Sequence, residues 1–276
     1  MDLYTKTAYE LSRLLTLRYS TSFGKSTKLF SKEMQPHIFA IYGLVRIADE
    51  IVDTYTGKHK KSMLNDLEKE TYQALTTGYS ANPLVHAFAQ TARHYDITKK
   101  LISPFFNSMR LDLASHRYTQ KLYQTYIDGS AEVIGLMCLK VFTDGNNTEY
   151  KKLEAGARAL GAAYQKVNFL RDLTSDYHER GRVYFPGVTY EAFGEEAKQA
   201  IIDDVRRDFA KASQAITNLP RDAQKAVGLS YLFYGELLEK LDHASVDTIK
   251  TSRVSVSRAR KTALLMKSKG GSLWRK

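Results

Sequence analysis

The chain has almost none of the cysteine that disulfide bonds and cysteine-rich zinc sites require. Of its 276 residues only one is a cysteine, so neither an intrachain disulfide nor a cysteine-rich zinc site can form. That residue, Cys138, lies in the apolar run 133–139, and a buried structural thiol is its expected role.

Long hydrophobic runs are also lacking. No uninterrupted apolar segment reaches the ~18 residues that suggest a membrane-spanning helix, and residues 1–6 lack the apolar core of a signal peptide. We therefore expect a cytoplasmic protein that does not span a bilayer.

Proline is scarce, with 5 residues, and no low-complexity stretch occurs, while 43% of residues are hydrophobic and 26% charged. This composition is typical of an ordered globular protein. No repeat period of 20–50 residues is present, which excludes a solenoid. We expect one domain over 1–266, followed by a flexible basic tail over 267–276.

Negative charge is in deficit, because 41 Lys and Arg face 30 Asp and Glu, giving a net charge of +11. Such a balance indicates an acidic partner, which could be nucleic acid, an anionic membrane surface or a phosphorylated substrate. Zinc-finger spacing, an RNA-binding aromatic signature and a long basic arm are all missing, so nucleic acid is not favoured. The sequence carries no signal for an oligomeric state.

Apolar residues recur at three- and four-residue steps along most of the chain, and no sustained alternation typical of strands appears. The prediction is an all-α fold. Helices are expected at roughly 2–18, 34–56, 61–77, 82–94, 99–115, 120–142, 148–177, 194–217, 221–243 and 254–267.

A polar stripe interrupts the apolar pattern in the second of these helices. Tyr42, Arg46, Asp49 and Asp53 step by four, three and four residues and so share one helix face. Two carboxylates four residues apart repel each other and need a cation, and oxygen ligands of this kind suit magnesium. Taken alone, the pair is a weak signal, and a solvated acidic helix face is the better interpretation of it.

A second stripe makes that alternative harder to sustain. Gln165, Asn168, Asp172 and Asp176 step by three, four and four, with Arg171 at the edge of the face. The two DxxxD motifs are more than about a hundred residues apart and each has an arginine upstream. If their helices face each other across a cavity, the carboxylates could hold a cluster of magnesium ions.

Such a cluster would serve to ionise a diphosphate ester. Magnesium neutralises charge as the carbon–oxygen bond breaks, while arginine and lysine bind the departing oxygens. The resulting allylic carbocation survives only where water is excluded, which calls for an apolar cavity. The 18 tyrosines and 12 phenylalanines provide material for its walls.

The sequence resembles the squalene and phytoene synthase family in both motifs. RIADEIVD at 46–53 resembles the family's first aspartate-rich motif, and NFLRDLTSD at 168–176 with RGRVYFP at 180–186 resembles the second. Further likeness at 19–23, 126–135, 234 and 253–256 extends over nearly the whole chain. The resemblance implies the isoprenoid synthase fold, a single helical bundle around a central apolar cavity.

The resemblance also implies roles for individual residues. Metal ligands would be Asp49, Asp53, Asn168, Asp172 and Asp176, with Mg²⁺ as the cofactor and Mn²⁺ as a substitute. Prenyl diphosphates would be bound by Ser22, Tyr42, Arg46, Gln165, Asn168, Arg171, Tyr234 and Arg253. Catalysis would rest on Tyr42, Arg46, Asp49, Asp53, Gln165, Arg171, Asp172 and Asp176. For Ser22 a helix cap, and for Tyr234 core packing, are equally good interpretations.

One segment departs from the family pattern. Asp128 stands where relatives often carry tyrosine, and Glu132 where they carry glycine. Spaced by four residues, the two acids could line the cavity and handle diphosphate-bound metal, or they could form local ion pairs. The sequence leaves both possibilities open.

The activity that the resemblance implies is head-to-head joining of two geranylgeranyl diphosphates to phytoene through a cyclopropyl diphosphate, without NADPH, in carotenoid biosynthesis. Alternatives are the joining of two farnesyl diphosphates to dehydrosqualene or squalene, and a non-catalytic relative that acts as an assembly or scaffold protein. Because these substrates are lipids, we also expect peripheral contact with the cytoplasmic membrane, for which Trp274 and the basic residues of the tail are candidates.

Overall fold

The computed structural model describes residues 1–114 and 117–270, without the side chains of 21, 22 and 267–270. Every regular element in this part of the chain is a helix. The elements are α1 Leu3–Tyr19, α2 Thr21–Thr27, α3 Met34–Asp49, η1 Glu50–Thr54, α4 Lys60–Thr77, α5 Pro83–His94, α6 Lys99–Leu111, α7 Gln120–Ile127, η2 Asp128–Glu132, α8 Val133–Phe142, α9 Asn147–Arg171, α10 Leu173–Arg180, α11 Glu195–Ile216, α12 Arg221–His243, α13 Val246–Thr251 and α14 Arg258–Gly270, where η marks π-helix.

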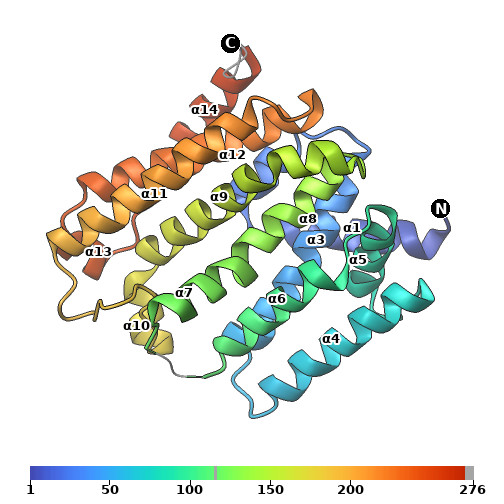
Figure 1. The fold of residues 1–276 in the computed structure, drawn as a ribbon, viewed down its shortest axis with the longest axis horizontal. Helices are drawn as coiled ribbons and strands as arrows, with labels where there is room; N and C mark the ends of the chain where they lie inside the picture. The colour runs from blue at the N-terminus through green and yellow to red at the C-terminus, as the bar shows by residue number, and fades with distance from the viewer. Residues whose placement is uncertain (115–116, 271–276) are drawn as a thin grey trace.

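The helices form one bundle in which α4, α6, α8, α9 and α11 follow one another side by side (Figure 1). Helices α1, α3 and α5 pack together, and α3 also contacts α6 and α8. Helix α12 packs on α9 and α11 and carries α2 and α14 on its other sides. This arrangement surrounds the centre of the bundle with α3, α8, α9, α11 and α12.

Side-chain caps fix several helix ends where the sequence has turn residues. Asn82 accepts a hydrogen bond from the Leu84 amide and is followed by Pro83 at the first helical position of α5. Asn146 accepts from the amides of the second and third residues of α9. Gly78 ends α4 with φ +77°, a conformation that disfavours a side chain.

The structure differs from the predicted helices mainly at the two polar stripes and at the segment that contains Asp128 and Glu132. The predicted helix 34–56 turns into the π-helix η1 after Asp49, and 120–142 contains η2 in its middle. The predicted helix 148–177 is divided at Asp172, whose φ −100° and ψ 10° are not helical. The short helices α2 and α13 were not predicted, and α14 begins and ends later than expected. Residues 271–276, including Trp274 of the expected tail, lie outside the described residues.

Close helix packing depends on glycine at two positions of α9. A Cβ atom on Gly156 would lie 2.1 Å from the Cβ of Ala215 on α11. One on Gly161 would lie 2.5 Å from the Ala131 carbonyl oxygen in η2. The absence of a side chain at these two positions lets α9 lie close to both neighbours.

Candidate active site

The centre of the bundle contains a cavity of about 250 Å³. Its wall is largely apolar, and its polar side chains in the described part are serines, Tyr164 and Gln165. Along α9 the lining runs from Leu153 to Gln165, about 18 Å at the helical rise of about 1.5 Å per residue. The lining residues are Phe23, Ser26, Phe30, Ile38, Val45, Ser130, Ala131, Ile134, Gly135, Cys138, Leu139, Phe142, Leu153, Gly156, Ala157, Leu160, Gly161, Tyr164, Gln165, Ala212, Ala215, Ile216, Leu219, Ala226, Val227 and Ser230.

The two ends of this cavity differ in character. Gln165 is three residues from Asn168 of the second stripe, so the polar motifs adjoin one end. At the Leu153 end the rings of Phe30 and Phe142 stack with centroids 5.1 Å apart. Cys138 lies in the wall between, and burial raises the pKa of its thiol to about 12, which suits an unreactive lining residue.

The first motif is held by Arg46. Its Nη1 lies 2.6 Å from Asp49 Oδ2, and its Nη2 donates to Glu50. The guanidinium also lies over the Tyr19 ring, 4.2 Å from the centroid. Because η1 follows Asp49 directly, Asp53 is carried on a wider turn than the four-residue spacing of an α-helix predicts.

The second motif is held by two arginines. Arg171 Nε donates to Asp172 Oδ1 at 2.9 Å, its Nη2 donates to the other carboxylate oxygen, and Arg253 Nε donates to Oδ1 at 2.7 Å. Burial acts to raise the pKa of Asp172, but these two guanidinium groups bring it below its ordinary value. The break in the helix at Asp172 leaves hydrogen bonds from the amides of Asp172 and Asp176 intact, so the stripe continues through it.

The structure brings the two motifs together across the bundle. Arg182 Nη1 donates to Asp53 Oδ1 at 2.8 Å, although the residues are far apart in sequence. Arg180 donates through Nη1 to Asp176 Oδ1 at 3.1 Å, and its Nε lies 3.5 Å from Asp53. Gly181, with φ +66°, ends α10 between the two arginines and turns the chain. Acids of both motifs therefore meet at Arg180, which is the arrangement that a shared metal cluster requires.

The carboxylates of these motifs lack full charge compensation. Burial, and then the neighbouring Asp53, raise the pKa of Asp49 to about 6 against the opposing effect of Arg46. Burial and then Asp172 raise the pKa of Asp176 to about 7, with Arg180 opposing. Half-buried carboxylates that repel one another provide the oxygen ligands and excess negative charge that Mg²⁺ requires, since this ion needs only one or two carboxylates beside substrate phosphates. The donor set fits a divalent cation.

The remaining predicted residues lie around these motifs. Tyr234 Oη is 3.4 Å from Asn168 Oδ1, and its ring stacks on that of Tyr164 with centroids 4.0 Å apart. Tyr42 stacks on Phe23, and burial raises the pKa of its hydroxyl to about 12. Ser22 belongs to α2, but its side chain lies outside the described residues.

Several neighbours of the site were not predicted from the sequence. Asp112 at the end of α6 is buried and approaches Arg182, whose side chain is 12% exposed. Burial and then the positive charges of Lys25, Arg171 and Arg253 lower the pKa of Lys261. These lysines therefore add to the positive charge beside the second motif, and their positions in sequence give no indication of it.

Asp128 and Glu132 both bind one arginine. Arg158 Nη1 lies 2.7 Å from Asp128 Oδ1 and 3.2 Å from Glu132 Oε2, and its Nε lies 3.3 Å from Glu154. Neither acid lines the cavity, although Ser130 and Ala131 between them do. Of the two possibilities left open by the sequence, the structure supports local ion pairs.

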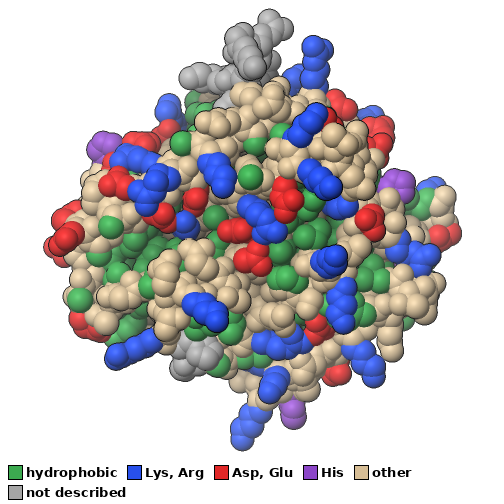
Figure 2. Space-filling view, in the orientation of Figure 1, with side chains coloured by type: hydrophobic (Ala, Val, Ile, Leu, Met, Phe, Trp, Pro, Cys, Tyr) green, Lys and Arg blue, Asp and Glu red, His purple; other side chains and the backbone are tan. Residues whose placement is uncertain are grey.

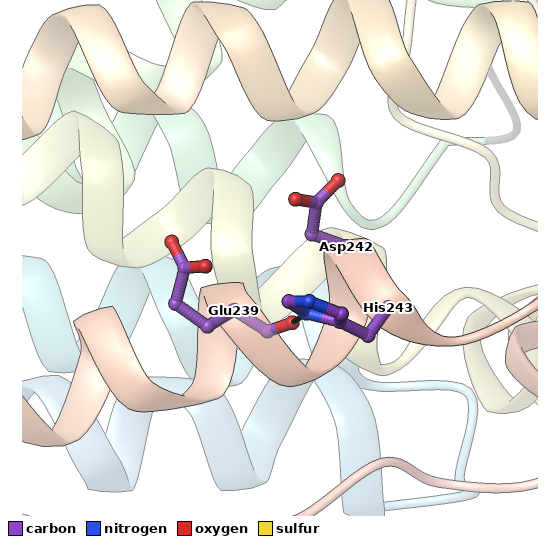
Figure 3. A group of neighbouring side chains, drawn as sticks. All are labelled: Glu239, Asp242 and His243. Atoms are coloured by element: carbon purple, nitrogen blue, oxygen red, sulfur yellow. Dashed lines mark hydrogen bonds between the residues drawn. The ribbon is translucent and has the colours of Figure 1, made fainter.

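One other group of potential metal ligands occurs among the residues that the structure describes. Glu239, Asp242 and His243 lie together on α12 (Figure 3). Arg206 Nη2 already donates to Asp242 at 2.7 Å, and His243 Nδ1 is 2.6 Å from the Glu239 carbonyl oxygen. With its members engaged and largely exposed, this group does not constitute a metal site.

The face of the bundle shown in Figure 2 intersperses lysine and arginine with aspartate and glutamate, and hydrophobic side chains appear between them. The positive excess is not gathered into one patch on this face. Over the described part of the chain, none of the helices combines the length and the apolar character needed to cross a bilayer.

An all-helical bundle with two aspartate motifs facing each other beside a central apolar cavity defines the isoprenoid synthase class. Residues 16–260 match the model of the squalene/phytoene synthase family. The chain belongs to this family, whose members are prenyltransferases that join prenyl diphosphates head to head with divalent metal ions.

Individual relatives agree with this assignment. The chain is 28% identical to the 15-cis-phytoene synthase of Synechococcus elongatus, with 88% of this chain and 86% of the relative covered. It is 26% identical to phytoene synthase 3 of Zea mays over 95% of this chain but only 66% of the longer plant protein. Among solved structures, a dehydrosqualene synthase superposes with a TM-score of 0.82 at 20% identity, covering 96% of each chain. A squalene synthase from Alicyclobacillus acidocaldarius gives 0.75 at 18% identity, covering 87% of this chain and 94% of the other. The predicted fold and family are confirmed.

Proposed function

We propose that the protein joins two geranylgeranyl diphosphates head to head to give phytoene, with Mg²⁺ and without NADPH. The observation that carries the proposal is the meeting of Asp53 and Asp176 through Arg180 and Arg182 beside one apolar cavity. A site for diphosphate ionisation thus adjoins a space for a hydrocarbon tail. The phytoene synthases among the relatives support the C20 substrate over farnesyl diphosphate.

The polar end of the cavity would bind the diphosphate groups. Arg46, Arg171 and Arg253 present guanidinium groups that pair with carboxylates here and match phosphate oxygens equally well. Asp49, Asp53, Asn168, Asp172 and Asp176 would hold Mg²⁺, or Mn²⁺ in its place. The metal would supply neutralisation of the charge that develops on the departing diphosphate.

The wall of the cavity would protect the cation. Ionisation breaks the carbon–oxygen bond of one substrate, and the allylic cation adds to the double bond of the second. Loss of a proton then gives the cyclopropyl diphosphate. Apolar and aromatic side chains along α8, α9 and α11 exclude the water that would otherwise capture the cation.

The second half-reaction would use the same cavity. The cyclopropyl diphosphate ionises, rearranges and loses a proton, leaving a conjugated central triene. In total two diphosphates and two protons leave, so no reductant is needed. Gln165, Tyr42 and Tyr234 lie near the boundary between the motifs and the cavity and would border the reacting carbons.

Access to lipid substrates suggests where the protein works. We place it in the cytoplasm with peripheral contact to the membrane, because both the substrate tails and the product partition into a bilayer. The net charge of +11 favours an anionic membrane surface.

The test is to incubate purified protein with Mg²⁺ and either geranylgeranyl or farnesyl diphosphate, with and without NADPH, and to identify the hydrocarbon by chromatography and mass. A C40 triene formed without NADPH, and lost on chelation of the metal, is the expected result. A C30 product would move the substrate to farnesyl diphosphate, and its NADPH dependence would separate squalene from dehydrosqualene. No product from either substrate, with folded protein, would favour a non-catalytic relative.

A further inference from the structure

Asp112 is a buried acid next to, but outside, the predicted motifs. It follows the last residue of α6 and is only 9% exposed. Tyr126 Oη donates to its Oδ2 at 2.5 Å and Tyr184 Oη donates to its Oδ1 at 3.1 Å. A carboxylate withdrawn from water is costly unless hydrogen bonds and a counter-charge stabilise it. The tyrosines supply the hydrogen bonds.

The counter-charge is Arg182, and this arginine is shared. Its Nη2 donates to the Asp112 carbonyl oxygen at 2.7 Å, while Nη1 lies 3.7 Å from Asp112 Oδ1. The same Nη1 donates to Asp53 Oδ1 at 2.8 Å. The guanidinium therefore lies between a buried acid that anchors it and an acid of the first motif.

We infer that Asp112 is a positioning residue that acts through Arg182 and controls how freely Asp53 can bind a divalent metal ion. The inference rests on the proposed function, in which Asp53 is a metal ligand. Arg182 and a metal ion are both cations and compete for the Asp53 carboxylate. Asp112 neutralises part of the guanidinium charge of Arg182 and fixes the orientation of that group. As long as it does so, Arg182 binds Asp53 through one nitrogen only.

Removing the charge of Asp112 weakens metal binding at Asp53 in two ways. In Asp112→Asn the guanidinium loses its buried counter-charge and pairs more strongly with Asp53. The region around Asp53 also becomes more positive by one charge, which repels a divalent ion. Loss of an outer partner of this kind weakens metal binding by about tenfold or more.

The experiment measures Mn²⁺ binding directly, from the electron paramagnetic resonance signal of free Mn²⁺, without substrate. Wild type, Asp112→Asn, Arg182→Gln and the double variant are compared, with Asp208→Asn as a control, since Asp208 pairs with Lys166 on another side of α9. We expect Asp112→Asn to bind Mn²⁺ about tenfold more weakly. The loss of Mn²⁺ affinity caused by Asp112→Asn should be smaller when Arg182 is already Gln, because only the direct charge effect of Asp112 then remains. Excess Mn²⁺ should restore turnover of Asp112→Asn.

The outcomes separate this inference from the proposed function. If wild type binds no Mn²⁺, both the metal assignment and the inference that rests on it are wrong. If wild type binds Mn²⁺ and Asp112→Asn binds it equally well, or Asp112→Asn weakens binding by the same factor with and without Arg182, only the inference is overturned. Should Asp112→Asn fail to fold, Arg182→Gln decides alone. It must bind Mn²⁺ at least as tightly as wild type, and weaker binding overturns the inference.

Discussion

Replacing Asp172 by asparagine removes one negative charge from the second motif while keeping the shape of the side chain. In the structure this carboxylate is 22% exposed and binds Arg171 and Arg253. If it supports the ionisation of a diphosphate, its charge acts mainly in the transition state. We expect the turnover number to fall by about a hundredfold or more, as for loss of a major electrostatic catalyst. This corresponds to roughly 2.7 kcal/mol of activation free energy.

The Michaelis constant should respond differently. Both arginines lose a carboxylate partner and become more available to the substrate's phosphate oxygens, so the Michaelis constant should stay constant or decrease. A loss confined to turnover marks an interaction made only in the transition state. The assay is steady-state formation of hydrocarbon from labelled prenyl diphosphate at saturating Mg²⁺.

Stability must be separated from catalysis, and the chain offers a matched control. Asp208 is also 22% exposed and pairs with a lysine at 2.7 Å, but it lies on α11 and does not line the cavity. For both Asp172→Asn and Asp208→Asn we expect the free energy of unfolding to fall by roughly 1–3 kcal/mol, between the values for surface and buried ion pairs. Only the first should lose turnover. Equal activity losses, or near-normal turnover in Asp172→Asn, would refute the reasoning.

Three further predictions concern the cavity, the π-helix and a half-buried histidine. Phe142→Ala opens the apolar end of the cavity and should shift preference toward longer prenyl diphosphates, while Cys138→Phe should shift it toward shorter ones; product chain lengths that do not change would contradict this. Asp128→Asn should leave turnover within about threefold of wild type, because this acid pairs with an arginine outside the cavity; a larger loss would give it a role in the site. Burial and then His94 lower the pKa of His37 to about 4 from 6.5, so the unfolded state takes up a proton first as pH falls. The free energy of unfolding should thus decrease by roughly 2 kcal/mol between pH 7 and pH 5, and His37→Gln should lack this decrease in urea unfolding.

Much of the fold was predictable because long amphipathic helices repeat their pattern many times. The expected helix 221–243 coincides with α12, and the expected boundaries at 77 and 82 fall where Gly78 ends α4 and Asn82 caps α5. Short helices such as α13 contain too few turns to show a period. A π-turn leaves no period of its own, so η1 and η2 look like α-helix in the sequence.

The site was predicted in part. Two acids at four-residue spacing, repeated on a second helix, indicate a shared metal site from the sequence alone. Asp112 gives no such signal, because one acid in an amphipathic helix resembles any solvated position. Its significance depends on contacts with Arg182 and two tyrosines that are distant in sequence, and only folding brings these together.

The central claim is that the protein joins two identical prenyl diphosphates in one cavity. The most direct measurement is to supply an equal mixture of unlabelled and fully deuterated geranylgeranyl diphosphate with Mg²⁺ and to determine the mass of the hydrocarbon product by mass spectrometry. The account predicts a C40 product in three mass classes, with the half-labelled class the most abundant. A product containing only one prenyl unit, or no hydrocarbon from folded protein, would contradict it.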